Sequence, residues 1–196
     1  PSMVLAHLLS DLTWRVPPLD SRFHLMQTPF GIFRGKEEMD FMRILVVSDT
    51  HGDYGALQRA ILAQPHAEVV IHLGDGAEEA ERAQAAFPEK RFLRLRGNCD
   101  WGSKLPAFLV EEFSGKRFYC THGAAEEVKY GLYEAERRAR EYKANVLLFG
   151  HTHTPLCEYD DGLYLLNPGS LHGFGATYGF VDVTKAGIVT QIVKLS

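Results

Sequence analysis

The chain has 196 residues, of which 45% are hydrophobic and 23% are charged, and its formal net charge is −4. These values are ordinary for one soluble globular domain with a sizeable core. The small negative charge excludes the basic footprint that an extended nucleic-acid partner requires, but it allows a small phosphorylated substrate. No apolar run reaches the roughly 18 residues of a membrane span, so we expect no membrane partner.

The cysteine content bears on the compartment. There are three cysteines, an odd number without close spacing. Such a set argues against a disulfide framework and favours a reducing cytoplasm. The cysteines are Cys99, Cys120 and Cys157.

Residues 1–41 differ from the rest of the chain, because they carry scattered prolines and show neither a strand period nor a helix period. A compact strand pattern begins at Met42, so residues 42–196 form the expected domain. Two explanations of residues 1–41 remain open. They are either translated upstream sequence, with Met42 as the natural start, or an N-terminal arm. An intact-mass measurement on protein from its native source distinguishes the two.

From Met42 onward, apolar runs alternate with helical patterns. The expected strands are 44–49, 69–75 and 91–98, and the expected helices are 54–64 and 78–87, the second stopped by Pro88. This alternation predicts parallel strands connected by helices that pack on the outside of the sheet.

The second half of the chain has a different pattern. A hairpin is expected at 106–123, a helix at 132–143, a buried strand at 146–154, and further hairpins at 157–167 and 178–195. Parallel units followed by antiparallel hairpins predict an α/β fold with two β-sheets packed face to face and flanked by helices.

Seven side chains that can bind metal lie at the ends of five apolar runs. Because ligands bind beyond the carboxyl ends of strands in an open α/β sheet, we expect these side chains to gather along one edge. Neighbouring glycines suit the close backbone approach that an ion or a phosphate requires. The set consists of Asp49, His51, Asp75, Asn98, His122, His151 and His153.

The chemistry of this set favours a borderline divalent metal ion over Ca²⁺ or Mg²⁺, which prefer oxygen ligands alone. No cysteine belongs to the set unless Cys99 joins it, so a closed structural zinc site is not expected. Each residue alone has a simpler explanation, such as a turn-forming aspartate or a structural histidine. Seven such residues at successive strand ends together indicate a two-metal hydrolytic site.

The motifs SDTHG, GD, GN, THG and GHTH, followed by NPGS at 167–170, resemble those of the calcineurin-like metallophosphoesterases. The likeness is greatest to their YfcE-type phosphodiesterase branch, for which MRILVVSDTHG is a typical start, and it covers residues 42–196. The resemblance implies a metallophosphoesterase fold, a four-layer αββα sandwich. It also places the NPGS segment near the site, where the residues alone predict only a turn.

The resemblance implies a role for each member of the set. A hydroxide between two ions roughly 3.5–4 Å apart would attack phosphorus in line, and no protein nucleophile is needed. Mn²⁺ is the expected metal, with Fe, Zn, Ni or Co as alternatives. The implied ligands are Asp49, His51 and His153 for the first ion, Asn98, His122 and His151 for the second, and Asp75 between them.

Cys99 departs from the pattern of the broad superfamily, in which many members have a histidine directly after the metal-binding asparagine. That histidine is thought to protonate the leaving oxygen, and the GNCD form is common in the YfcE-type branch. A thiol with a pKa of about 8.5 is a weaker proton donor at neutral pH than an imidazolium. We therefore expect slow hydrolysis and a preference for good leaving groups such as aryl phosphodiesters. The alternative is that Cys99 is a small side chain without a role.

The expected function is hydrolysis of small phosphodiesters by a metal-dependent phosphodiesterase or phosphatase. Cyclic nucleotides, other phosphodiesters, phosphomonoesters and pyrophosphates all remain open as substrates, because specificity depends on the loops. The alternative is a non-catalytic scaffold, since the eukaryotic retromer subunit resembles this fold but lacks a full histidine set. Exposed hairpin edges could pair subunits into a homo-oligomer. The expected catalytic residues are Asp75, Asn98, Cys99 and His122.

Three other histidines are not expected to bind metal. His72 lies inside a strand and is expected to be packed or hydrogen-bonded there. His66 follows a proline in a connection and is expected to be exposed. His172, just after NPGS, could reach the substrate opening.

Overall fold

The computed structural model describes residues 41–184 and 186–196, which form three helices and ten strands. In chain order they are β1 (Met42–Val47), α1 (Tyr54–Ala63), β2 (Ala67–His72), α2 (Ala77–Ala86), β3 (Arg91–Arg94), β4 (Phe108–Phe113), β5 (Lys116–Thr121), α3 (Tyr133–Glu141), β6 (Val146–Leu148), β7 (Leu156–Asp160), β8 (Leu163–Asn167), β9 (Thr177–Val183) and β10 (Ile188–Lys194).

The first sheet has the strand order β10-β9-β1-β2-β3. Strands β1, β2 and β3 run parallel, and the helices α1 and α2 connect them. Strand β9 pairs antiparallel with both β1 and β10. The parallel strands expected from the alternating pattern, and the hairpin expected at 178–195, are therefore confirmed.

The second sheet has the order β4-β5-β6-β8-β7. Its outer pairs, β4 with β5 and β7 with β8, are the antiparallel hairpins expected from the sequence. Its centre is parallel, because β6 pairs in the same direction with both β5 and β8. Both sheets are therefore mixed.

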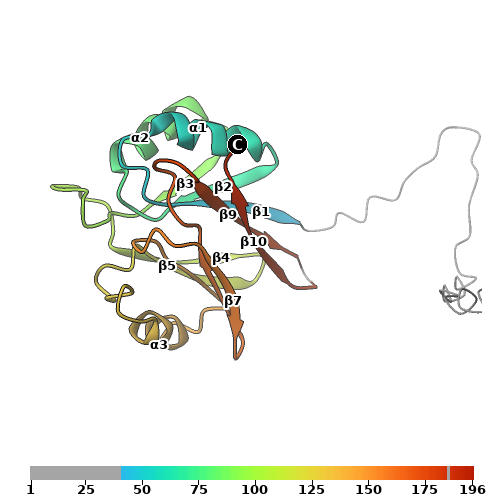
Figure 1. Ribbon diagram of the computed structural model, residues 1–196. Helices are drawn as coiled ribbons and strands as arrows, with labels where there is room; N and C mark the ends of the chain where they lie inside the picture. Colours follow the sequence, from blue (N-terminus) through green and yellow to red (C-terminus); the bar gives the residue numbers. More distant parts are fainter. Residues whose placement is uncertain (1–40, 185) are drawn as a thin grey trace, which may run out of the picture. The chain divides into compact units, whose positions relative to one another are not determined.

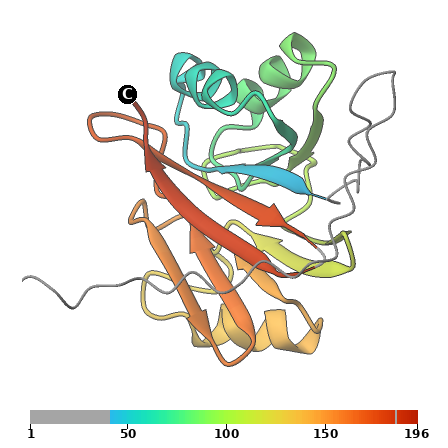
Figure 2. The same cartoon turned by 90° about the vertical axis from the view of Figure 1, so that its right-hand side faces the viewer.

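Three clusters of buried side chains separate four layers (Figures 1 and 2). The central cluster joins the two sheets and contains, for example, Ile71 from β2 and Phe118 from β5. The helices α1 and α2 cover the outer face of the first sheet, and α3 covers the outer face of the second. The expected αββα sandwich is confirmed.

The apolar run of β1 follows from this position between layers. Ile44 and Val46 face the second sheet, whereas Leu45 packs in the cluster that contains α1. Successive side chains of a strand point to opposite faces, so a strand that is covered on both faces must be apolar throughout. The loop after β1 begins with Ser48 and Asp49, which are still fully buried.

The layers bring the carboxyl ends of β1, β2, β3, β5 and β6 to one edge, where the five ligand-bearing loops begin. Backbone hydrogen bonds join loops within and between the sheets. Asp49 N donates to Gly74 O at 3.0 Å, and Gly150 N donates to His122 O at 3.1 Å. The edge expected to carry the ligands is therefore a continuous surface built from both sheets.

The structure also bears on the cysteines, on membrane spans and on residues 1–41. The three cysteines are free, as expected. None of the helices in the described ranges is long and apolar enough to cross a membrane. The two explanations of residues 1–41 concern a segment that, apart from Phe41, lies outside the described residues.

Candidate metal centre

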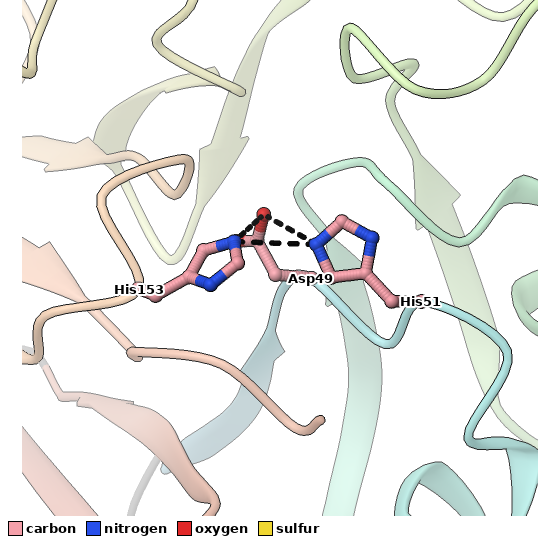
Figure 3. Close-up of side chains that lie close together, drawn as sticks. All are labelled: Asp49, His51 and His153. Carbon is pink, nitrogen blue, oxygen red and sulfur yellow. Dashed lines mark hydrogen bonds and ion pairs between the residues drawn. The ribbon is translucent and has the colours of Figure 1, made fainter. Parts of the chain in front are cut away.

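One group of ligand-type side chains joins the end of β1 to the loop after β6. His51 Nε2 and His153 Nε2 face each other at 3.2 Å across the carboxylate of Asp49 (Figure 3). Asp49 Oδ1 lies 3.2 Å from His153 Nε2 and 3.8 Å from His51 Nε2. Two imidazole nitrogens and one carboxylate oxygen thus converge on a single point.

The carboxylate of Asp49 fits a metal ion better than it fits its protein partners. Its side chain is fully buried, and no hydrogen-bond partner among the described residues reaches Oδ1. The other oxygen, Oδ2, accepts from His151 N at 3.1 Å. A buried carboxylate oxygen without a donor is costly unless a cation neutralises it, so this atom suits a metal ligand.

A second group lies where β2, β3, β5 and β6 end. Asp75, His122 and His151 offer ligand atoms within 4.8 Å of one another. His122 Nε2 is 3.5 Å from Asp75 Oδ2 and 3.0 Å from Asn98 Oδ1. Asp75 also faces the first group, since its Oδ2 lies 4.0 Å from His51 Nε2. The structure therefore brings all seven ligand-type residues together and puts Asp75 between the two groups.

The hydrogen bonding of His122 sets its tautomer. Its Nδ1 lies 3.0 Å from the carbonyl oxygen of Leu73, which can only accept, so Nδ1 carries a proton. In the neutral ring, Nε2 then turns a lone pair toward the oxygens of Asp75 and Asn98. Three lone pairs aimed at one point repel each other unless a proton or a cation lies among them, so this group also fits a metal ion.

The charges of the second group are coupled. Burial opposes ionisation of Asp75, but hydrogen bonds from the imidazolium form of His122, which carries a proton on both nitrogens, and from Cys99 N–H hold its pKa well below the usual range. Burial likewise opposes protonation of His122, yet the Asp75 carboxylate and the nearby Asp49 raise its pKa above the ordinary value. Burial lowers the pKa of His151. Asp75 is therefore an anion at neutral pH, as a metal ligand must be.

The backbone at the ligands is strained. Five of the seven ligand-type residues have positive φ angles between 41° and 67°, in the left-handed region that non-glycine residues rarely adopt. Such outliers cluster where the surrounding structure imposes them for a site. The five are Asp49, His51, Asp75, His151 and His153.

Close backbone approach occurs at the glycine before Asn98. A Cβ atom on Gly97 would collide with the backbone and carboxylate of Asp75. Only a glycine allows the end of β3 to lie this close to the end of β2. The glycine spacing expected from the sequence therefore serves the approach of Asn98 to Asp75.

Asp100, which was not among the residues expected at the site, organises the loops at this edge. Its Oδ2 accepts from Asp75 N at 2.8 Å and from Gly97 N at 2.7 Å. Its Oδ1 accepts from Gly76 N at 3.0 Å and from Ala77 N at 2.9 Å, at the start of α2. The helix start that it caps lies 23 residues earlier in the chain, so no local sequence signal marks this contact, although helix N-termini attract anions.

Two further supports lie behind the ligands. Ser170 Oγ donates to Asp49 O at 2.8 Å, so the NPGS segment lies at the site. Thr50 Oγ1 lies 3.2 Å from His72 Nε2 and 3.4 Å from the carbonyl oxygen of Asp75. His72 is buried and hydrogen-bonded as expected. These contacts fix the positions of the Asp49 and Asp75 loops relative to β2.

His66, His172 and Cys99 were also singled out in the sequence. His66 is exposed, as expected. The His172 ring lies 5.9 Å from the His51 ring, measured between centroids, so this residue does reach the edge of the site. Cys99 is exposed, its Sγ lies 3.3 Å from Asn98 Nδ2, and its backbone N–H donates to Asp75 Oδ1 at 2.7 Å.

Residues 42–186 match the family model described as the calcineurin-like phosphoesterase superfamily domain. The chain belongs to this superfamily. It is 34% identical over 132 residues to the probable metallophosphoesterase YsnB of Bacillus subtilis, covering 66% of this chain and 75% of that protein. It is 28% identical over 170 residues to the phosphodiesterase YfcE of Escherichia coli, covering 72% and 88% of the two chains.

Solved structures show the same fold. A predicted phosphoesterase from Streptococcus pneumoniae aligns with a TM-score of 0.66 at 23% identity, covering 79% of this chain and 90% of that one. Vacuolar protein sorting 29 from Cryptosporidium parvum aligns with a TM-score of 0.63 at 16% identity, covering 80% and 98%. At these identities the structural likeness establishes the metallophosphoesterase fold alone.

Proposed function

We propose that this chain is a phosphodiesterase that hydrolyses small phosphodiesters with two bound divalent metal ions. The observation that carries the proposal is the convergence of two groups of ligand atoms, in which Asp75 Oδ2 lies 3.5 Å from His122 Nε2 and 4.0 Å from His51 Nε2. Asp49, His51 and His153 would hold one ion, and Asn98, His122 and His151 would hold the other. When bound, the two ions would activate water as the nucleophile and neutralise charge on the phosphoryl oxygens.

The protein's own contribution is to hold these side chains in place. Asp75 receives a hydrogen bond from Cys99 N–H on one carboxylate oxygen, which leaves the other oxygen directed at His51 and His122. The proton on His122 Nδ1 is retained by Leu73 O, so Nε2 stays available as a ligand atom. This orientation by neighbouring groups is what keeps a metal site selective for one geometry.

The metal in this proposal is a borderline divalent ion, with Mn²⁺ first and Fe, Zn, Ni or Co as alternatives. Four imidazoles among seven ligands favour such ions over Ca²⁺ or Mg²⁺. Availability in the cell decides among ions of this class as much as affinity does.

The rival function is a protein-binding scaffold, because structural neighbours include vacuolar protein sorting 29. Two observations favour the enzyme. All seven ligand positions carry a side chain that can bind metal, and the named relatives of higher identity are a probable metallophosphoesterase and a phosphodiesterase.

The test measures metal content and hydrolysis of bis-p-nitrophenyl phosphate by the protein with added Mn²⁺. We expect two bound ions and turnover in the wild type. Asp75→Ala and His122→Ala should lower turnover more than about 100-fold, beyond the usual effect of residues that only support a metal site. The exposed His66→Ala is the matched control and should behave as the wild type. A protein without metal or turnover, in which all three variants equal the wild type, would support the scaffold.

A further inference from the structure

Two hollows open beside the candidate metal centre, one on each side of the loop 98–102. The larger, of about 700 Å³, is bordered by His51, Asp75 and Cys99. The smaller, of about 310 Å³, is bordered by Asn98 and His122. The two hollows therefore border different members of the ligand cluster. Both volumes fall within or near the range of pockets that hold small ligands.

Trp101 borders both hollows. It directly follows Asp100, whose carboxylate anchors the loop to four backbone N–H groups. Trp101 itself is 91% exposed. A large indole held in solvent beside a polar cluster buries little of its own surface, so it adds almost nothing to the stability of the fold. Its flat face remains available to a ligand.

The charges of the larger hollow restrict what can enter it. Three glutamates at the start of α2 border it, against one arginine and one lysine. A group that carries another phosphate would face the repulsion of these carboxylates, whereas an uncharged group would not. Two further carboxylates border this hollow, Asp75 of the ligand cluster and Asp100, which accepts from backbone N–H groups. The remaining charged side chains are Glu78, Glu79, Glu81, Arg94 and Lys104.

These observations together point to the shape of the substrate. We infer that Trp101 determines specificity by stacking on a flat aromatic arm of the phosphodiester, an aryl group or a nucleoside without a further phosphate. That arm occupies the larger hollow, and the second ester arm occupies the smaller one, with phosphorus at the ligand cluster between them. The inference rests on the proposed phosphodiesterase function and adds a substrate class to it. Stacking of a base on an aromatic side chain tolerates many bases, so Trp101 selects for aromaticity rather than for one base.

The test compares two substrates with the same leaving group, bis-p-nitrophenyl phosphate and methyl p-nitrophenyl phosphate. Only the arm that stays on phosphorus differs, so the ratio of the two kcat/KM values reports selection for an aromatic arm. We expect the wild type to favour the bis-aryl ester. In Trp101→Ala this ratio should fall about tenfold, mainly through KM, and Trp101→Phe should keep most of it. Tyr130→Ala is the matched control, because Tyr130 is also 91% exposed but borders neither hollow. An unchanged ratio in Trp101→Ala overturns the inference.

A binding measurement separates this inference from the proposed function. Phenol is a poor leaving group, so diphenyl phosphate serves as a ligand that persists, and dimethyl phosphate is its non-aromatic partner. Calorimetry of the Mn²⁺-loaded protein should show tighter binding of diphenyl phosphate, and Trp101→Ala should lose that preference. Tighter binding of diphenyl phosphate without turnover would contradict the proposed function but support the stacking role of Trp101. Turnover without that binding preference would support the proposed function but contradict the stacking role.

Discussion

Cys99 occupies the position next to the candidate ligand Asn98, and its thiol is exposed at the larger hollow. Partial desolvation of the thiol, together with the neighbouring Asp75 carboxylate, raises the pKa of Cys99 above the ordinary value. The thiol is therefore protonated at neutral pH, but it is a weaker acid than an imidazolium. As a proton donor to a leaving oxygen it would help poorly, which agrees with slow hydrolysis of esters that have poor leaving groups.

We predict that Cys99→His raises turnover on an alkyl phosphodiester several-fold or more, because general acid catalysis contributes about 10²–10⁴-fold when the donor is well matched. Turnover on bis-p-nitrophenyl phosphate should change less, since p-nitrophenolate leaves without a proton. Steady-state rates on the two substrates check this. Cys157→His, at an exposed cysteine on β7, is the control. If both substrates respond alike, Cys99 is not at the leaving-group position.

At the scale of elements, Asp100 joins the end of β2, the end of β3 and the start of α2. The helix α2 has no side-chain cap of its own at Gly76, so the Asp100 carboxylate acts as the cap from a distant loop. The same carboxylate holds the backbone of Asp75 and Gly97. One side chain thus sets the spacing between the loop of Asp75 and the loop of Asn98.

We predict that Asp100→Asn lowers the free energy of unfolding by about 2–3 kcal/mol, because an amide places an N–H₂ group against backbone donors that a carboxylate oxygen accepted. Metal affinity should fall about 10–100-fold, as it does when a supporting group of a metal site is removed. Urea denaturation and metal titration by calorimetry measure the two effects. Asp161→Asn is the control, because the Asp161 side chain is 96% exposed. Wild-type metal affinity in Asp100→Asn would contradict this role.

The element scale also shows how far the sequence could predict the site. The convergence of the seven ligand-type residues was predictable because each lies within a few residues of the end of an apolar run, and parallel strands end at the same edge. Asp100 and Trp101 were not, because their roles depend on how loop 98–102 folds back over β2. No period or strand end marks that path. A carboxylate that accepts only from backbone N–H groups has no partner residue type that a sequence pattern could reveal.

At the scale of the whole molecule, the fold was predictable for a different reason. Strands covered on both faces carry unbroken apolar runs, 44–47 in β1 and 69–71 in β2, and turn residues separate the paired strands of the three hairpins. The order of the strands in the second sheet was less accessible. The insertion of β8 between β6 and β7 depends on packing between separate segments, so no local sequence pattern predicts it.

The pH dependence of stability is a property of the whole molecule to which His72 contributes. His72 is 1% exposed, and burial lowers its pKa to about 4 from 6.5. Between pH 4 and pH 6.5, His72 is mostly protonated in the unfolded chain and mostly neutral in the folded chain. Stability is therefore complete above about pH 6.5 and falls as pH drops toward 4.

We predict that this residue alone makes the protein about 2 kcal/mol less stable at pH 5 than at pH 7. Urea denaturation with a chelator present measures the loss without interference from metal binding. His72→Asn should show a loss smaller by that amount, whereas His66→Asn, at an exposed histidine, should retain the full dependence. Equal pH dependence in the wild type and His72→Asn would show that His72 is not the responsible group.

The left-handed backbone at five of the seven ligand positions has a consequence for how such proteins change over time. Each such residue costs of the order of 1 kcal/mol, whereas a domain's net stability is only about 5–15 kcal/mol. The residues that form the site are therefore among those that the fold would lose most readily if selection acted on stability alone. A lineage that ceased to need the chemistry would drift toward relaxed loops and keep its four layers. A chain that keeps all seven ligand-type residues in this backbone carries a cost in stability that only a use of the site offsets.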